Sequence, residues 1–341
     1  MEPVVSAIIT TCKRSPKYII RALKSVMVQT YQHIEIIVVD DSPVDYLERE
    51  RVKKAVLQIC PQVRYIINNE NHGAPAARNL GIQEARGTYI GFLDDDDEWL
   101  PKKIEEQLAG FINENIALVY GKQCLSYDSE HCQFVPQEDY SFGRIFEQLL
   151  IKNYIGSTSN PLIKKECLKA IGGFDEAIRS AQDYDLYLRL AQQYEIMYVP
   201  CISIIYHIHD DDRISTSYQD KRLGMEQIIK KYSHEFNQHL QAWVNHHRTL
   251  IIYYRQNGNY LNALRVWYAT ACKCPSDVRN NIVFLLITIF SSDFCLFRWY
   301  HSMKIYRFRK KNGTICGQND NGEKEMVRYT NGKIGEYKTA N

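Results

Sequence analysis

The stretch TYIGFLDDDDEW, residues 88–99, passes from a short apolar run directly into four consecutive aspartates. Ile90, Phe92 and Leu93 have the pattern of a buried strand. Four carboxylates at the end of such a strand repel one another and cost roughly several kcal/mol to desolvate, unless a cation or hydrogen-bond donors compensate. Mg²⁺ and Mn²⁺ prefer oxygen ligands and bind between carboxylates and substrate phosphates. The stretch therefore predicts a divalent cation beside a phosphate group.

The same acids also fit a plainer interpretation, a solvated turn that caps a helix beginning near Pro101. Their position after a buried strand favours the ligand site, because ligands in open α/β sheets bind beyond the carboxyl ends of the strands.

Strands and helices alternate on both sides of this stretch. The pattern predicts strands at residues 4–11, 35–41, 63–68 and 89–93, and helices at residues 18–29, 52–60 and 74–85. This spacing is typical of βαβ crossovers, so we expect an α/β fold whose mainly parallel sheet has helices on both faces. The residues that should meet along one edge of that sheet are Thr10, Thr11, Asp40, Asp41 and residues 94–97. A nucleotide would bind at this edge.

The composition limits the classes of protein. With 341 residues, 45% apolar and 24% charged, the chain accommodates one large globular domain and an appendage. A net charge of +2 argues against nucleic acid as a partner. Of the ten cysteines only Cys272 and Cys274 are closely spaced, which argues against a zinc site. No secretory signal precedes the first strand, so we expect reduced thiols and a cytoplasmic protein.

Two common nucleotide-binding folds do not fit. The turn after the first strand reads CKRSP, so neither the GxGxxG of dinucleotide-binding proteins nor a P-loop is present. Asp40 and Asp41, at the end of the second predicted strand, are able to accept a hydrogen bond from a base N3–H or a ribose hydroxyl. The alternative for this pair is an Asx turn leading into Ser42.

Four short motifs follow one another in the order TTCKR (10–14), VVDDS (38–42), GAPAARN (73–79) and FLDDDD (92–97). Together they resemble the successive motifs of family 2 glycosyltransferases, and the resemblance extends over residues 4–217. It implies a Rossmann-like GT-A fold and an inverting transfer of sugar from a nucleotide-sugar.

The resemblance also implies roles for the residues at the sheet edge. Asp40 would recognise the N3–H of uracil, and Asp96 would bind the cation that bridges the diphosphate. The other donor-side residues would be Thr10, Thr11, Arg14, Arg78, Asp94 and Asp95, with Asp94 facing the ribose and Arg78 near the diphosphate. The remaining acid, Asp97, fits a cap of the next helix, and Arg78 alone would fit a surface residue paired with a neighbouring acid.

A second set of motifs concerns the acceptor. GGFDE (172–176) resembles the acceptor-side loop of the family, with Gly173 and Asp175 as its site residues. Asp183 lies where the family carries its catalytic base, although Gln182 replaces the usual Glu. Asp183 alone would also fit a helix N-cap, and Asp185 is expected to support the same helix.

A histidine follows the strand predicted at residues 201–206. His209 lies where relatives place a histidine in reach of metal or diphosphate, before Arg213, Ser215 and Ser217, which would belong to a lid. The alternative is a surface histidine among acids.

The chain changes character after the expected GT-A catalytic domain, residues 1–219. We expect a helical region over 220–310 and a polar tail without structure over 311–341. A tetratricopeptide-like hairpin is predicted with Gly258 at its turn, from the spacing of Tyr254, Ala263, Trp267 and Pro275.

An apolar run, residues 282–290, is too short to span a bilayer and predicts a core helix. The aromatic and basic residues that follow it favour an alternative, a membrane-facing helix within residues 282–311. Such a helix would place the protein peripherally at the inner face of the plasma membrane.

The resulting hypothesis is a metal-dependent inverting hexosyltransferase that uses a UDP-sugar and Mn²⁺ or Mg²⁺. The acceptor would be a hydroxyl of a saccharide or lipid-linked saccharide in bacterial surface-polysaccharide synthesis, a setting implied by the resemblance. Two alternatives remain. One is a nucleotidyltransferase of related fold. The other is a catalytically silent nucleotide-sugar-binding module, which is favoured only by the nonstandard residues Gln182 and Cys12–Lys13.

Overall fold

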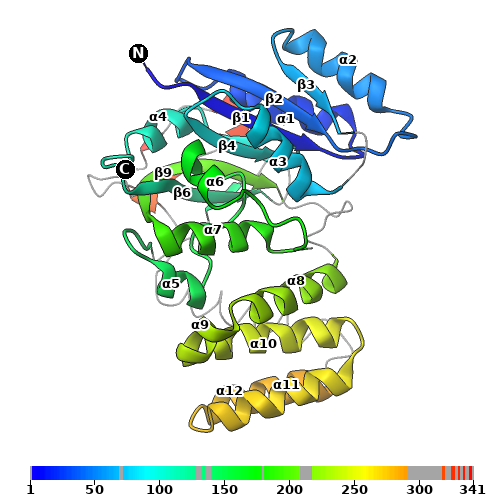
Figure 1. Cartoon of the computed structure of the whole chain (residues 1–341), viewed down its shortest axis with the longest axis vertical. Helices are drawn as coiled ribbons and strands as arrows, with labels where there is room; N and C mark the ends of the chain where they lie inside the picture. The colour runs from blue at the N-terminus through cyan, green and yellow to red at the C-terminus, as the bar shows by residue number, and fades with distance from the viewer. Residues whose placement is uncertain are drawn as a thin grey trace. The chain divides into compact units, whose positions relative to one another are not determined.

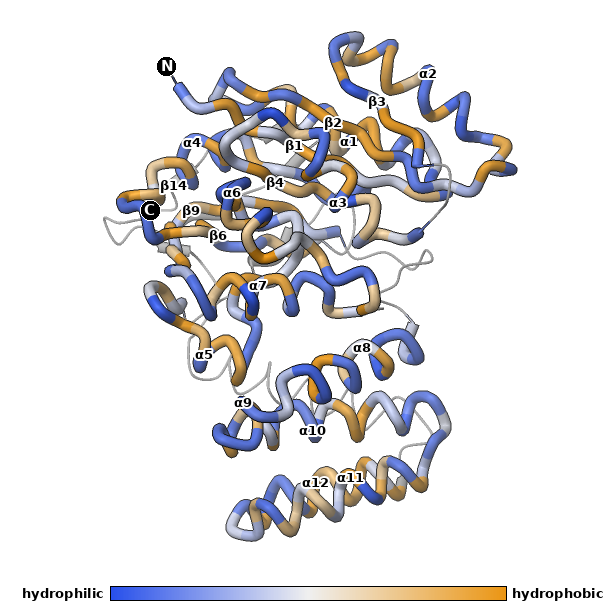
Figure 2. The backbone as a smooth tube through the Cα atoms, in the orientation of Figure 1, coloured by the Kyte–Doolittle hydropathy of each residue, from blue (hydrophilic) through white to orange (hydrophobic). Residues whose placement is uncertain are grey.

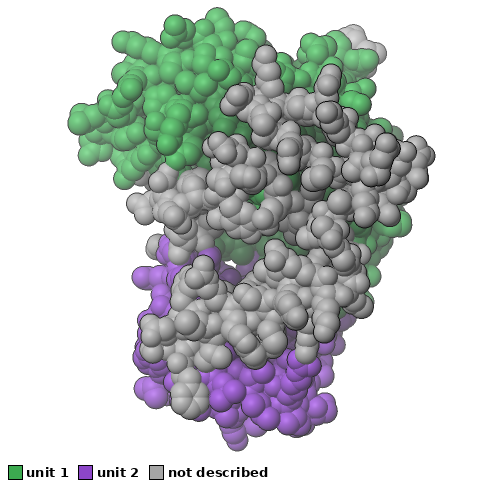
Figure 3. Space-filling view, turned by 180° about the vertical axis from the view of Figure 1, so that it is seen from behind, with its two compact units in different colours: residues 1–210 green, residues 211–341 purple. Residues whose placement is uncertain are grey.

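A computed structural model describes residues 2–68, 72–126, 132–134, 140–178, 180–207 and 217–290, and five short strands between residues 317 and 339 (Figure 1). The chain divides into two compact units, residues 1–210 and 211–341, which are coloured separately in Figure 3. Each unit is described by itself.

The first unit is built on a nine-stranded sheet with the order β3-β2-β1-β4-β8-β6-β9-β5, to which β7 is added beside β6. The strands are β1 (Val5–Thr11), β2 (Ile34–Asp40), β3 (Arg64–Ile67), β4 (Tyr89–Asp94), β5 (Glu98–Trp99), β6 (Ile116–Ser126), β7 (Cys132–Phe134), β8 (Leu162–Lys164) and β9 (Glu195–His207). Strands β3, β2, β1 and β4 are parallel, as are β6 and β9, whereas β8 runs antiparallel to both β4 and β6. The predicted mixed, mainly parallel α/β sheet is therefore confirmed.

The register of these strands sets the position of the site. Thr10 lies opposite Asp94, and Thr11 lies opposite Asp40. The carboxyl ends of β1, β2 and β4 consequently meet at one edge, as the sequence predicts.

The helices of this unit are α1 (Pro16–Met27), α2 (Arg49–Ile59), α3 (Ala74–Glu84), α4 (Lys103–Leu108), α5 (Phe146–Ile151), α6 (Lys165–Ala170) and α7 (Gln182–Gln193). Helix α1 begins with proline, which is favourable at the first helical position, and it buries Ile19, Leu23 and Val26 on one face. In Figure 2 the tube of α2 alternates between hydrophobic and hydrophilic residues, as expected of a helix that buries Arg49, Val52 and Val56 on one face. Nearly all of β1 is buried, which indicates that both faces of the central sheet are covered.

Two elements differ in extent from what the sequence pattern predicts. The pattern of residues 141–151 predicts a helix over that whole range, but α5 begins only at Phe146, because Gly143 has a φ of +87° and pairs with Ile196 as extended backbone. The strand expected at residues 201–206 is the longer β9, which includes Pro200.

The second unit contains α8 (Tyr218–Lys231), α9 (Ser233–Gln238), α10 (Leu240–Gln256), α11 (Tyr260–Lys273) and α12 (Val278–Phe290). Helices α10 and α11 form the predicted hairpin, with Gly258 at a φ of +71° in its turn. The small core of the unit consists of Ile251, Ala263, Phe284 and Ile287, so the apolar run of α12 contributes to a core.

The other face of α12 is apolar and exposed, at Val278, Ile282, Leu286 and Ile289. Among the described residues no helix is both long and apolar enough to cross a membrane. In the polar stretch after residue 311, the described part consists of strands β10 (Gly317–Gln318), β11 (Lys324–Met326), β12 (Tyr329–Thr330), β13 (Lys333–Ile334) and β14 (Lys338–Thr339).

Candidate active site

The four aspartates form a tight turn between β4 and β5. The backbone N–H of Asp97 donates to the carbonyl oxygen of Asp94 at 3.0 Å. Asp95, Asp96 and Asp97 are buried, with exposed fractions of 6%, 7% and 0%. The interpretation as a solvated turn is therefore wrong, and so is that of Asp97 as a helix cap, since α4 has its N-cap at Lys102.

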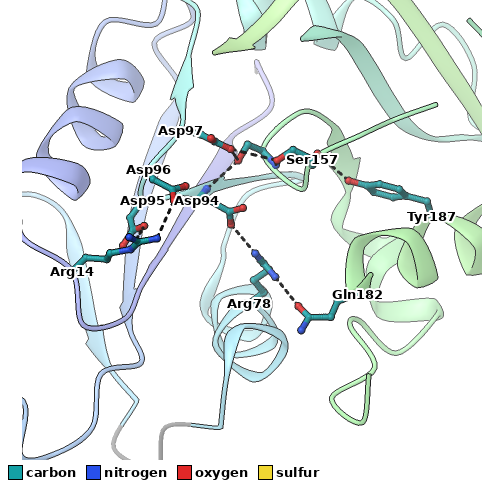
Figure 4. Close-up of polar contacts among 10 residues, drawn as sticks. Arg14, Arg78, Asp94, Asp95, Asp96, Asp97, Ser157, Gln182 and Tyr187 are labelled. Carbon is teal, nitrogen blue, oxygen red and sulfur yellow. Dashed lines mark hydrogen bonds and ion pairs between the residues drawn. The ribbon is translucent and has the colours of Figure 1, made fainter. Parts of the chain in front are cut away.

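Arg14 supplies positive charge to this turn (Figure 4). Its Nη2 atom lies 3.0 Å from Asp96 Oδ2, and its Nε atom lies 3.6 Å from Asp95 Oδ1. Thr11 Oγ1 donates to Asp95 Oδ2 at 2.6 Å. Burial, together with the neighbouring Asp96, raises the pKa of Asp95 to about 7. The structure thus brings the predicted Thr11, Arg14, Asp95 and Asp96 together.

Arg78 joins the turn to helix α7. Its Nη2 atom donates to Asp94 Oδ1 at 2.6 Å, and its Nη1 atom donates to Gln182 Oε1 at 3.2 Å. The guanidinium is buried and also lies 5.4 Å from the ring centroid of Phe174. Arg78 is therefore not a surface residue paired with a neighbouring acid. A buried, planar cation at this point is well suited to bind phosphate oxygens.

Asp183 lies in the first turn of α7, directly after Gln182. Its Oδ1 atom accepts a hydrogen bond from the backbone N–H of Tyr184 at 2.8 Å. Burial raises the pKa of Asp183 to about 6, although the Tyr184 N–H and Arg78 act in the opposite direction. The N-cap of α7 is Ala181, so the interpretation of Asp183 as the cap is wrong.

Strain also marks this entrance to α7. Ala181 has a φ of +62°, a left-handed conformation that costs a non-glycine residue about 1–2 kcal/mol. Lys13, directly before Arg14, has a φ of +52°. In the described part of the chain these are the two non-glycine residues with positive φ, and both lie within two residues of a predicted site residue, Arg14 or Asp183.

Asp40 is engaged by the protein itself. Its carboxylate accepts from the backbone N–H of Ser42 at 2.9 Å and from the Tyr65 hydroxyl at 2.7 Å, and it lies 3.6 Å from Arg49 Nε. The contact to Ser42 is the Asx turn considered above, so a uracil base at Asp40 would compete with Tyr65. The neighbouring Asp41 accepts from the Gly73 N–H at 2.9 Å.

The loop at residues 172–176, which is predicted to face the acceptor, is held by Asn79, a residue that the sequence did not single out. Asn79 Nδ2 donates to the carbonyl of Phe174 at 2.9 Å, and its Oδ1 accepts from the Phe174 N–H at 2.8 Å. Gly173 has a φ of +71°, and a Cβ atom there would lie 2.5 Å from Asn79 Oδ1. Asp175 accepts from the Ala177 N–H at 3.1 Å, which closes its own turn.

Asn79 lies within the GAPAARN motif, one residue after Arg78. Its place in that motif is the sequence feature that could have identified it. Ser157 and Ser159, which contact Asp97, carry no comparable pattern.

The donor set for a metal ion is partial. In the described ranges no group of three or more His, Cys, Asp or Glu side chains is arranged to hold one. Asp95 and Asp96 offer carboxylate oxygens, which suit Mg²⁺ or Mn²⁺ when phosphate oxygens complete the coordination. His209, Arg213 and Ser215 lie outside the residues that the structure describes, whereas Ser217 is the N-cap of α8.

Known proteins resemble this chain in sequence. Residues 6–172 match the family model described as Glycosyl transferase family 2. WcaA of Escherichia coli K12, a glycosyl transferase named for colanic acid biosynthesis, is 31% identical over 244 residues, which cover 69% of this chain and 83% of WcaA. An uncharacterized glycosyltransferase of Haemophilus influenzae is 29% identical over 273 residues, which cover 78% of this chain and 90% of that protein.

A solved structure shows the same fold. The crystal structure of S. aureus TarS superposes with a TM-score of 0.51 at 17% sequence identity, over 82% of this chain and 54% of the TarS chain. The likeness confirms the predicted GT-A fold, and this chain spans about half the length of TarS.

Proposed function

Because this chain belongs to glycosyl transferase family 2 and is a glycosyltransferase, we propose that it moves a sugar, with inversion, from a nucleotide-sugar to an acceptor hydroxyl. UDP-sugar is the proposed donor, and a saccharide or lipid-linked saccharide is the proposed acceptor. The name of WcaA supports a place in surface-polysaccharide synthesis. Family membership favours this reaction over the nucleotidyltransferase alternative.

The observation that carries the proposal is the contact chain from Asp94 through Arg78 to Gln182. It links the acidic turn, where the diphosphate would bind, to the first turn of α7, where Asp183 lies. Inverting transfer is a single displacement that needs one base. The Asp183 carboxylate would accept the proton of the acceptor hydroxyl as that oxygen attacks the anomeric carbon from the face opposite the leaving nucleoside diphosphate.

Arg78 and Arg14 would hold the donor. The guanidinium of Arg78 keeps N–H groups beyond those given to Asp94 and Gln182, and these would donate to diphosphate oxygens. A divalent cation would neutralise charge on the departing diphosphate. Asp96 and, from the resemblance, His209 are the residues that would hold it.

Release of free nucleotide from UDP-, GDP- and dTDP-sugars tests the proposal, with Mn²⁺ or Mg²⁺ and with chelator. We expect metal-dependent release from a UDP-sugar, because slow donor hydrolysis needs no acceptor. Asp183→Asn should bind donor but lose turnover, whereas Asp96→Ala should lose metal-dependent donor binding. Normal turnover in either variant would contradict the assigned role, and binding without turnover in the wild-type protein would favour the silent module.

We also propose peripheral binding of residues 282–311 to anionic membranes. The support is the exposed apolar face of α12, where Ile282 and Ile289 are 53% and 52% exposed, and the basic residues that follow in the sequence. Flotation with anionic liposomes should fall for Ile282→Ser combined with Ile289→Ser. The control Leu261→Ser removes a 72% exposed apolar side chain from α11 and should float like the wild type. Equal flotation of all three proteins would refute the proposal.

A further inference from the structure

Asp97 is the acid of the turn for which the proposed reaction gives no role. Its side chain is fully buried, and a buried carboxylate requires hydrogen-bond donors. Ser159 Oγ donates to Asp97 Oδ2 at 2.6 Å, and Ser157 Oγ lies 3.4 Å from the same oxygen. We call Ser157 and Ser159 the serine bracket. Asp97 is thus the point at which the turn is attached to the loop before β8.

The hydroxyl group of Ser159 closes the turn by acting both as a hydrogen-bond donor and as an acceptor. Besides donating to Asp97, Ser159 Oγ accepts from the backbone N–H of Asp94 at 3.1 Å, so one hydroxyl contacts both ends of the turn. The carbonyl of Ser159 accepts from Trp99 Nε1 at 2.9 Å. Because Ser159 and Trp99 are both buried, Ser159 has little freedom to move.

Ser157 extends this connection to the helix that carries Asp183. The hydroxyl group of Tyr187 donates to the carbonyl oxygen of Ser157 at 3.1 Å, and Figure 4 shows the ring of Tyr187 directed from α7 toward the bracket. Tyr187 follows Asp183 by one helical turn, so the two side chains lie on the same face of α7. Burial and the nearby Asp183 raise the pKa of Tyr187, so its hydroxyl stays protonated and available as a donor.

We propose that Ser157, Ser159 and Tyr187 are positioning residues that fix the distance between the acidic turn and the base Asp183. Together with the route through Arg78 and Gln182, they attach α7 to the turn on both sides of Asp183. The inference rests on the proposed function, because that distance separates the donor from the base. A misplacement of about 1 Å in such a site can lower a rate about 100-fold.

Tyr187→Phe tests the link to the base, with Tyr120→Phe as its matched control. Tyr120 of β6 is also fully buried, and its hydroxyl donates to the carbonyl of Ser141 at 2.9 Å rather than to the serine bracket. We expect Tyr187→Phe to lower kcat of nucleotide release about tenfold, with KM for donor within about twofold, because the turn itself is unchanged. Tyr120→Phe should keep kcat while losing at least as much thermal stability. Equal kcat in the two variants would refute the link.

Ser159 is tested by UDP binding, which needs no turnover. We expect Ser159→Ala to weaken the affinity for UDP with Mn²⁺ about tenfold in calorimetry, and Ser159→Thr to restore most of it, since Thr keeps the hydroxyl. Unchanged affinity in folded Ser159→Ala, or no rescue by Thr, would overturn the role of Ser159. If wild-type protein binds UDP but never turns over a nucleotide-sugar, the proposed function fails while this comparison still stands. Should Ser159→Ala not fold, Tyr187→Phe decides.

Discussion

Asp183, the proposed base, lies in a buried environment that disfavours its charged form. Its pKa is raised to about 6 by burial, so the carboxylate form predominates only above that pH. We therefore expect kcat of nucleotide release to rise with pH and to level off above an acid limb near pH 6. A pH–rate profile measured between pH 5 and 8.5 checks this. A profile that is flat through pH 6, in a protein that is active and folded, would contradict Asp183 as the base.

The same shift predicts the stability of a variant. The pKa of Asp183 is higher in the folded than in the unfolded chain, so its contribution favours folding at low pH and is lost as the pH rises through about 6. At pH 7.5 the buried charge is a net cost, and Asp183→Asn should raise the free energy of unfolding by about 1–2 kcal/mol. Urea unfolding of wild type and variant at pH 7.5 and pH 5 measures the difference, which should shrink at pH 5.

Asp185, on the same helix, provides a control for which the expected change in the free energy of unfolding has the opposite sign. Its buried carboxylate accepts from Arg189 Nε at 2.8 Å, so Asp185→Asn breaks a buried ion pair and should lower the free energy of unfolding by about 1–3 kcal/mol. Stabilisation by both substitutions would indicate a general effect of removing acids from α7.

Gln182 offers a separate test of the electrostatics around the base. Gln182→Glu would place a second carboxylate beside Asp183. The new carboxylate would also pair with Arg78, which donates hydrogen bonds to Asp94 and Gln182 in the wild-type protein, so less of the positive charge of Arg78 would act on Asp183. Both effects raise the pKa of Asp183. We expect the acid limb of the pH–rate profile to move up by about one unit, with little change of rate at pH 8.5. An unmoved limb would mean that Arg78 and Gln182 do not influence the base.

At the scale of elements, β4 and β5 are held against each other by close packing at a glycine. A Cβ atom at Gly91 would lie 2.6 Å from Trp99 Cη2. The indole N–H of Trp99 in turn donates a hydrogen bond to the carbonyl of Ser159, which holds the acidic turn. Gly91→Ala should therefore lower the free energy of unfolding by about 1–3 kcal/mol through overpacking, and it should also raise KM for donor. Urea unfolding and the nucleotide-release assay measure the two effects.

Gly172→Ala is the comparison for that variant. Gly172 has a φ of +79°, and a Cβ atom added there would have no neighbouring atom within 4 Å, so the cost of about 1 kcal/mol comes from the backbone alone. Gly91→Ala should leave Trp99 displaced, whereas Gly172→Ala should not alter KM for donor. Equal effects on KM would argue against the packing explanation.

The central elements could be predicted because the sequence pattern that defines each of them lies within one short stretch of the chain. The buried run at residues 4–11 and the acids after residue 93 define β1, β4 and the edge where they meet, since parallel strands bring their carboxyl ends together. The three-residue β8 and the helix α6 escaped prediction because they are too short to show a period. Ser159 contacts Asp97 across 62 positions of sequence, and a buried serine carries no pattern that names its partner.

At the scale of the whole molecule, each compact unit has a hydrophobic core of its own. The first unit buries a large cluster that includes Ile9, Ile19 and Leu93, whereas the second buries Ile251, Ala263, Phe284 and Ile287. In the second unit Arg248 fixes α12 to α10, with its Nη1 2.8 Å from Asp277 Oδ2 and its guanidinium 5.4 Å from the ring centroid of Phe284. Separate cores of unequal size predict that unfolding is not a single two-state transition.

Phe284→Ala tests that expectation, because its side chain is 5% exposed within the smaller core. Truncation should cost that unit about 3–5 kcal/mol and lower the melting temperature of one calorimetric transition. Nucleotide release at room temperature should stay at the wild-type rate, since the proposed donor and base residues all belong to the first unit. The counterpart Ile19→Ala, in the larger core, should shift the other transition by a loss of about 2–5 kcal/mol. One transition that both substitutions move equally would show instead that the two cores unfold together, and the helical second unit would then contribute to the stability of the first unit.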